Sequence, residues 1–258
     1  MANPYAFKRL PPARVKDRES TAAMDEVARF TAIAEAWWDP VGEFRPLHKV
    51  NPVRLAFIRR MLLDHFGRDE SQLRPFTGLK LLDVGCGGGL LSEPLARMGF
   101  EVTACDAGDR NIAVAKVHAE QAGLAIDYRV AAPEDMGDER FDVAVSMEVI
   151  EHVPDPQVFL AAISRLLGPN GAFLGATLNR TPKSYALAVV GAEYILRWLP
   201  KGTHDWHKFV KPSEFAGYLR HAGLDVRTIS GMTYIPFRDE WQESGDTEVN
   251  YMLYAVRP

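Results

Sequence analysis

The sequence has only two cysteines, Cys86 and Cys105, among its 258 residues. Two cysteines are too few for a disulfide scaffold, and their spacing is not that of zinc ligands, so a reducing compartment is expected. Neither sign of charge dominates, because 30 Lys and Arg residues stand against 34 Asp and Glu residues and give a formal net charge of -4. The basic residues are scattered and form no stripe, which argues against a nucleic-acid-binding protein.

Long hydrophobic runs are also missing. The longest uninterrupted apolar stretch runs from Tyr185 to Ala192, far short of the roughly 20 residues that cross a bilayer. The first twenty residues mix basic and acidic side chains with three prolines and contain no apolar core of a signal peptide. We therefore expect no membrane span, a flexible tail over residues 1–22, and a single domain over residues 23–258.

Short apolar segments and helical segments alternate after Gly78, which predicts a parallel sheet covered on both faces. The expected strands are 79–85, 100–106, 126–131, 141–147, 171–178, 225–235 and 250–258, and the expected helices between them are 90–99, 110–123 and 155–168. Upstream, apolar residues at helical spacing predict one helix over Met24–Trp38 and a second from Asn51, with Pro52 in its first turn. These two helices form an expected cap over residues 23–70.

The stretch LLDVGCGGG places Gly85 and Gly87 between a predicted strand and a predicted helix. Glycines here let the backbone turn sharply and approach a ligand closely. Asp106 ends the next predicted strand, twenty-one residues after Gly85, where a carboxylate can accept hydrogen bonds from ribose hydroxyls. Together these residues predict a nucleoside site.

NAD and S-adenosylmethionine are the two candidate ligands of that site. The alternating glycines do not follow the G-x-G-x-x-G order that receives a pyrophosphate. S-adenosylmethionine has no phosphate and carries a cationic amino acid end, for which an acid such as Asp83 is a sensible neighbour. The form D-V-G-C-G-G-G resembles motif I of the class I methyltransferases.

A second polar group follows the predicted strand 141–147, in the string MEVIEHVPDP. If a helical turn starts at Glu148, then Glu148, Glu151 and His152 share one face. That face could hold a hard or borderline cation, or His152 could act as a base. The structural alternative is that the string only closes the strand and caps the next turn.

The string WWDPVGEFRPLHKVNPVRLAFI, residues 37–58, is similar to the N-terminal signature of the ubiquinone-biosynthesis O-methyltransferases, the UbiG family. The segment LNRTPKSYALAVVGAEYILRWLPKGTHDWHKFVKPSE and the late VNYMLYA resemble the same family. The resemblance therefore covers roughly Phe30 to Val256. It implies an α/β, Rossmann-like class I methyltransferase fold with a seven-stranded, mostly parallel sheet, N-terminal helices, and a helical insertion after the fifth strand at about 180–212.

The activity implied by the resemblance is O-methyl transfer from S-adenosylmethionine to phenolic hydroxyls of polyprenylated catechol and demethylubiquinol intermediates. In bacteria the family acts at two steps, on a 2-polyprenyl-6-hydroxyphenol and on a 3-demethylubiquinol. Two alternatives stay open from the residues. The protein could methylate another small phenol, or it could be a non-catalytic, membrane-associated partner that binds S-adenosylmethionine.

The resemblance also assigns site residues. Arg54 matches an arginine that touches the cofactor, Met147 matches the position beside the adenine, and Glu148, Glu151 and His152 match positions assigned to magnesium in mitochondrial relatives. The candidate cofactor-binding residues are thus Arg54, Asp83, Gly85, Gly87, Asp106 and Met147, the candidate catalytic residues are Glu148 and His152, and the candidate metal ligands are Glu148, Glu151 and His152.

The segment from Lys183 to Lys201 carries aromatic residues beside basic ones. A helix that is apolar on most sides is usually buried, whereas aromatic and basic flanks are typical of a helix that lies in a membrane interface. The resemblance favours the second interpretation, because this insertion is associated with membrane attachment in the family. We expect a cytoplasmic protein that is peripherally associated with the anionic surface of the inner membrane, with other quinone-biosynthesis enzymes as candidate partners.

Overall fold

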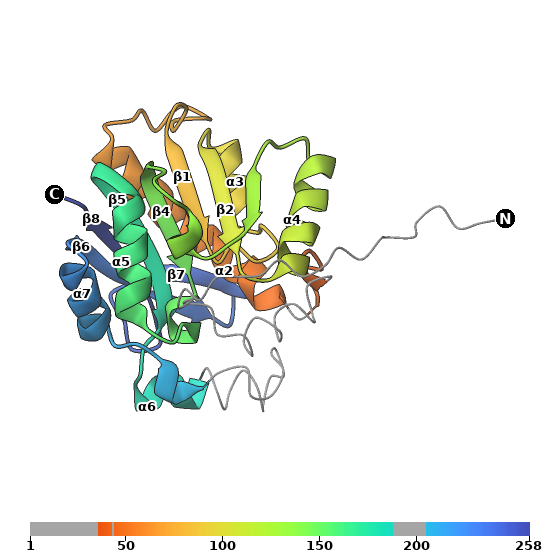
Figure 1. Ribbon diagram of the computed structural model, residues 1–258. Coiled ribbons are helices and arrows are strands. Elements are labelled where there is room, and N and C mark those ends of the chain that lie inside the picture. Colours follow the sequence, from red (N-terminus) through yellow and green to blue (C-terminus); the bar gives the residue numbers. More distant parts are fainter. Residues whose placement is uncertain (1–35, 43, 188–204) are drawn as a thin grey trace, which may run out of the picture.

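One mixed sheet with helices on both of its faces forms the body of the protein (Figure 1). The computed structural model describes residues 36–42, 44–187 and 205–258. The elements are α2 Arg45–His65, β1 Lys80–Val84, α3 Ser92–Arg97, β2 Glu101–Asp106, α4 Asp109–Gln121, β3 Asp127–Val130, β4 Phe141–Met147, α5 Pro156–Leu166, β5 Leu167–Leu178, α6 Pro182–Ser184, α7 Pro212–His221, β6 Asp225–Ile235, β7 Glu240–Ser244 and β8 Asn250–Val256.

The described residues contribute eight strands to the sheet, in the order β3-β2-β1-β4-β5-β8-β6-β7. The first five strands in this order pair in parallel, and β8 is inserted antiparallel between β5 and β6. The prediction of a mostly parallel Rossmann-like sheet with an antiparallel strand from the last hairpin is confirmed. The predicted number of seven strands is wrong, because β7 adds an edge strand. Its sequence, EWQES, has a single apolar side chain, Trp241, and so gave no strand pattern.

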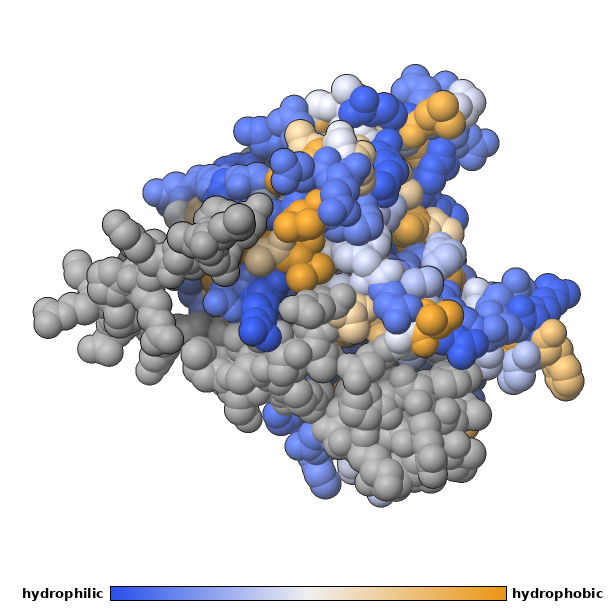
Figure 2. All heavy atoms as spheres, turned by 90° about the vertical axis from the view of Figure 1, so that its right-hand side faces the viewer, coloured by the Kyte–Doolittle hydropathy of each residue, from blue (hydrophilic) through white to orange (hydrophobic). Residues whose placement is uncertain are grey.

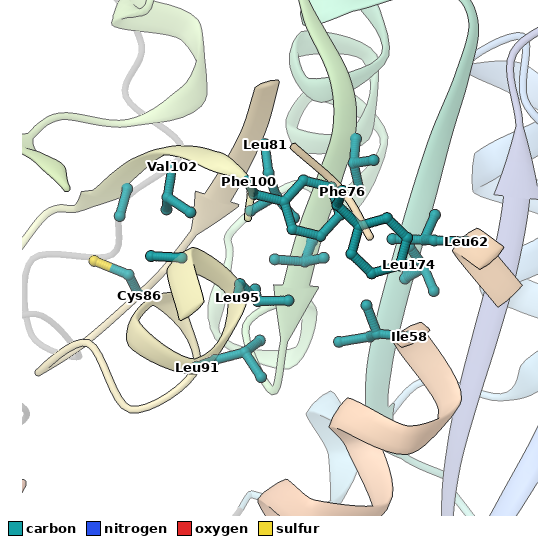
Figure 3. Packing of buried hydrophobic residues seen from close by; sticks show 14 of the residues in the cluster. Ile58, Leu62, Phe76, Leu81, Cys86, Leu91, Leu95, Phe100, Val102 and Leu174 are labelled. Atoms are coloured by element: carbon teal, nitrogen blue, oxygen red, sulfur yellow. The ribbon is translucent and has the colours of Figure 1, made fainter. Parts of the chain in front are cut away.

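Side chains of alternate strand residues point to opposite faces of the sheet and build two apolar cores. Leu81 of β1 packs in the core beneath α2, α3 and α4, and the adjacent Leu82 packs in the core beneath α5 and α7. Figure 3 shows part of the first core, where the rings of Phe76 and Phe100 stack with centroids 4.5 Å apart. Because the core strands are apolar on both faces, the polar residues that remain are concentrated at the strand ends.

Helix α2 begins six residues earlier than predicted. It starts at Arg45, so that Pro46 occupies the first turn and Pro52, which was expected there, lies inside the helix. Either proline is compatible with a first turn, and the sequence offered no means to choose between them. Of the predicted helix Met24–Trp38, residues up to 35 lie outside the described part of the chain, as does the predicted tail 1–22, while Trp37 and Trp38 lie in a turn.

The short helix α6 follows β5, in the segment where the insertion is predicted. Thr181 caps α6, its Oγ1 accepting a hydrogen bond of 3.0 Å from the backbone N–H of Ser184. Residues 188–204 lie outside the described part of the chain, and α7 begins at Pro212. Among the helices that are described, none is long and apolar enough to span a membrane. The boundaries of the single domain and of the insertion stay predictions.

Candidate functional site

The glycine loop that follows β1 is shaped by close contacts with other parts of the chain. The backbone N–H groups of Gly85 and Cys86 both donate to the carbonyl of Cys105, at 2.8 and 3.1 Å, which ties the loop to the end of β2. Gly85 and Gly87 have positive φ angles of 75° and 52°. A Cβ on Gly87 would lie 2.4 Å from the indole ring of Trp37. Glycine is therefore required at position 87 by backbone conformation and by space together.

Asp106 lies beside this loop at the carboxyl end of β2, as the sequence predicted. Its Oδ2 accepts a hydrogen bond of 3.0 Å from the backbone N–H of Gly87. Its Oδ1 accepts from the backbone N–H of Gly108 at 2.8 Å and from the Asn111 Nδ2 at 3.0 Å. A carboxylate has about four acceptor positions, so the described donors leave Oδ2 with capacity for a further donor such as a ribose hydroxyl.

Asp83 is in β1, beneath the loop, and is buried. Its Oδ2 accepts a hydrogen bond of 2.6 Å from the Oγ of Ser92, which joins β1 to α3, the two elements that flank the loop. Burial raises the pKa of the Asp83 carboxyl from 3.8 to about 7, against a smaller lowering by the Ser92 hydrogen bond. Direct contact of Asp83 with a cofactor stays a prediction, and its described contact supports the loop instead.

The second polar group follows β4 and does not have the expected helical form. Glu148 has a positive φ of 57°, and the helical turn, of 3₁₀ type, begins only at Ile150 and ends at His152. The helical turn does not start at Glu148, and the condition for Glu148, Glu151 and His152 to share one helical face is therefore not met. The strained backbone at a non-glycine residue marks this bend as one that the surrounding structure imposes.

The side chain of Arg54, in α2, contacts this bend. It is buried, and its Nη2 donates to the Oε1 of Glu148 at 2.6 Å. The Arg54 Nε is also buried and has no hydrogen-bond partner among the described residues. Arg54 is therefore not an ordinary surface residue of a helix. A buried guanidinium with an open N–H is suited to a further anionic or carbonyl group.

Glu151 points into the protein, where its Oε2 accepts a hydrogen bond of 2.8 Å from the Oγ1 of Thr177 in β5. Burial raises the pKa of the Glu151 carboxyl well above its ordinary range, and the charge of Glu148 raises it further. Two carboxyls this close together favour a shared proton or a cation. Across the described chain, however, no three His, Cys, Asp or Glu side chains come together as a set that could hold a metal ion. Glu148, Glu151 and His152 are thus not seen as such a set among the described residues, and their role as metal ligands stays a prediction.

Sequence reasoning missed two tryptophans that cover the loop. Trp37 packs against Gly87 and Gly88, and the Trp38 Nε1 donates to the carbonyl of Gly88 at 2.9 Å. The Trp38 ring also stacks on His118 at 3.4 Å between centroids. The signal was present as the adjacent WW pair, but helical spacing placed Trp37 on the apolar face of a helix and gave it no role in the site.

Comparisons with known proteins agree with this geometry. The family model described as "Methyltransferase domain" matches residues 82–175. A ubiquinone biosynthesis O-methyltransferase of Paramagnetospirillum magneticum is 63% identical over 242 residues, which cover 93% of this chain and 97% of the relative. A protein of the same description from Azorhizobium caulinodans is 51% identical and covers 91% of this chain and 93% of the relative.

Solved structures show the same fold at low identity. Magnesium protoporphyrin IX methyltransferase from Synechocystis PCC 6803, with bound SAH, has a TM-score of 0.61 at 18% identity and covers 91% of this chain and 94% of its own. A possible histamine N-methyltransferase from Thermotoga maritima has a TM-score of 0.60 at 14% identity and covers 92% of this chain and 100% of its own. The fold is that of S-adenosylmethionine-dependent methyltransferases.

We expect Gly87→Ala to destabilise the protein more than Gly123→Ala. Both glycines have positive φ, but a Cβ at Gly123 would have no atom within 4 Å, whereas at Gly87 it would meet Trp37. The backbone strain of about 1 kcal/mol is common to both, and overpacking adds about 1–3 kcal/mol at Gly87 only. Urea unfolding followed by circular dichroism measures the difference. Equal losses in the two variants would contradict the close packing of Trp37 on the loop.

Proposed function

The chain belongs to the ubiquinone biosynthesis O-methyltransferase family, and from this premise we propose how its site holds the cofactor and activates the acceptor. The protein is an S-adenosylmethionine-dependent O-methyltransferase of ubiquinone biosynthesis. Its acceptor is a small phenol of that pathway, and we infer a phenolic hydroxyl on a polyprenylated catechol or demethylubiquinol. The observation that carries the proposed site is the hydrogen bond between the glycine loop and Asp106, at the same sheet edge as the buried Arg54.

The cofactor is held by four features in this proposal. The glycine loop at Gly85 and Gly87 allows close backbone approach. The remaining acceptor position of Asp106 receives a ribose hydroxyl, and the Arg54 guanidinium, whose buried Nε has no described partner, receives the amino acid end. Met147, which ends β4, is proposed to contact the base. S-adenosylmethionine supplies an electrophilic methyl group when bound.

His152 is the proposed base. A phenol with a pKa near 10 is mostly protonated at neutral pH, so its proton must pass to a nearby group as the oxygen attacks the methyl carbon. His152 ends the 3₁₀ turn beside Glu151 and is only partly buried. Its imidazole takes the phenolic proton, and the phenolate oxygen takes the methyl group. Glu148 is proposed to act by charge, since its ion pair with Arg54 fixes a carboxylate beside the reaction.

Magnesium has no step in this mechanism. The described side chains do not form a three-ligand site, and Arg54 already provides a cation for Glu148. Mixed carboxylate and imidazole ligation is also less typical of magnesium than all-oxygen sites.

We propose that residues 183–201 contact the membrane, and the described start of this segment supports the proposal. Tyr185 and Leu187 are exposed, which disfavours a buried helix at this end. Lys183 was expected to be one of the basic residues that face the membrane. Its Nζ instead binds Asp246 and Glu248 at 2.5 and 2.9 Å, so its charge is balanced within the protein. The face in Figure 2 is mostly hydrophilic in its described part, with apolar residues in small separate groups. The proposed membrane contact uses the insertion, and partner enzymes stay a prediction.

The activity is tested by transfer of a labelled methyl group from S-adenosylmethionine to a short-chain prenyl catechol, with magnesium and again after chelation. We expect transfer that is indifferent to the chelator and falls by about 10²-fold or more in His152→Ala, the usual size of a lost general base. Collapse on chelation and recovery with magnesium would contradict the metal-free mechanism. Cofactor binding with transfer only to other phenols in an acceptor panel would contradict the prenylated acceptor.

Flotation with anionic liposomes tests the membrane contact. The wild type is expected to float, and the double substitution Tyr185→Ser, Leu187→Ser to float less because it removes exposed apolar area from the insertion. Phe237→Ser is the matched control, since Phe237 is fully exposed but lies in the β6–β7 turn. A wild type that stays wholly at the bottom of the gradient, or equal losses in the two variants, would contradict the proposed contact.

A further inference from the structure

A chain of hydrogen bonds joins Trp37 to the carboxylate of Asp106. The Trp37 Nε1 donates to the Oδ1 of Asn111 at 3.0 Å, and the Asn111 Nδ2 donates to the Oδ1 of Asp106 at 3.0 Å. Trp37 and Asn111 are 8% and 2% exposed. The first hydrogen bond is buried and the second is partly buried, and hydrogen bonds that are shielded from water restrain their partners more strongly than those at a surface.

The chemistry of the two ends fixes the orientation of the amide between them. An indole N–H can only donate, and an ionised carboxylate can only accept. Asn111 must therefore present its oxygen to Trp37 and its NH₂ group to Asp106. The amide cannot flip without breaking both contacts, so the side chain of Asn111 holds Oδ1 of Asp106 in one place.

The position of Trp37 is itself fixed. Its ring stacks on Phe44, with centroids 3.8 Å apart and an angle of 10° between the planes. Its other neighbour is the glycine loop, where a Cβ at Gly87 would lie 2.4 Å from the ring. The backbone N–H of the same Gly87 donates to Oδ2 of Asp106. Trp37 therefore restrains both carboxylate oxygens of Asp106. It restrains Oδ1 through Asn111 and Oδ2 through the glycine loop.

We propose that Trp37 is a positioning residue for the cofactor, which acts through Asn111 to hold the Asp106 carboxylate in the orientation that receives the ribose. The inference rests on the proposed function, because it takes Asp106 as the ribose-binding acid. It adds that the segment before α2 is part of the cofactor site and not only a cover over it. Trp37 should then increase the affinity only for ligands that carry the ribose hydroxyls.

The test is a calorimetric titration of two ligands, S-adenosylhomocysteine and its 2′,3′-dideoxy analogue, into the wild type and into Trp37→Phe. Phenylalanine keeps an aromatic ring against Phe44 and the loop but removes the N–H donor. We expect Trp37→Phe to weaken the binding of S-adenosylhomocysteine by about threefold to tenfold, the usual size of one hydrogen bond. Binding of the dideoxy analogue is expected to change little, because the ligand lacks the groups that Asp106 holds.

Trp38→Phe is the matched control. Trp38 donates to the Gly88 carbonyl and so contacts the same loop, but it has no described hydrogen bond to Asn111 or Asp106. Any loss in Trp38→Phe should be the same for both ligands. Asn111→Ala interrupts the chain from its middle and should repeat the ligand-dependent loss of Trp37→Phe, which keeps the test decisive if Trp37→Phe does not fold.

The outcomes separate the two proposals. A wild type that does not bind S-adenosylhomocysteine contradicts the proposed function. A wild type that binds it, with variants at Trp37 and Asn111 that weaken both ligands by one factor, leaves the function intact and overturns the positioning role. A wild type that binds both ligands equally well overturns the positioning role too, because no ribose hydroxyl is then held at Asp106.

Discussion

The glycine loop that follows β1 packs closely against the chain segment before α2. The site depends on this packing. The loop has no room for a Cβ at Gly87, because Trp37 lies against it. The backbone N–H of Gly87 also donates a hydrogen bond to Asp106. Loop, acid and tryptophan therefore hold one another in place, and the ends of β1 and β2 are joined at the edge of the sheet where open α/β folds bind their ligands.

A second arrangement of charges lies at the end of β4. The buried Arg54 forms an ion pair with the partly buried Glu148, and the Glu151 carboxylate accepts a hydrogen bond from Thr177. Buried charges are costly unless they are paired, and the left-handed backbone of Glu148 adds strain. Strain and buried charge at one bend are typical of a functional site. These features support the proposal that the bend belongs to the reactive part of the site.

Much of this could be predicted from the sequence, because strand and helix periods are local properties. Asp83, Gly85 and Asp106 were proposed as site residues from their places near strand ends, and Arg54 and Met147 only from family resemblance. The rest depended on contacts between distant residues. The left-handed turn at Glu148 broke the expected helical face, Pro46 and Pro52 were equally good helix starters, and β7 was too polar to be recognised. Nothing in the spacing of Trp37 and Asn111, 74 residues apart, indicates their hydrogen bond.

The most direct test of the account is the affinity of Asp106→Asn for S-adenosylhomocysteine, compared with that of Asp109→Asn. Both changes remove one negative charge near the start of α4, but Asp109 is exposed and is joined only to the backbone of Arg110 among the described residues. The account predicts a loss of about tenfold or more for Asp106→Asn, as for a hydrogen bond to a charged group, and no change for Asp109→Asn. Wild-type affinity in Asp106→Asn would contradict the account.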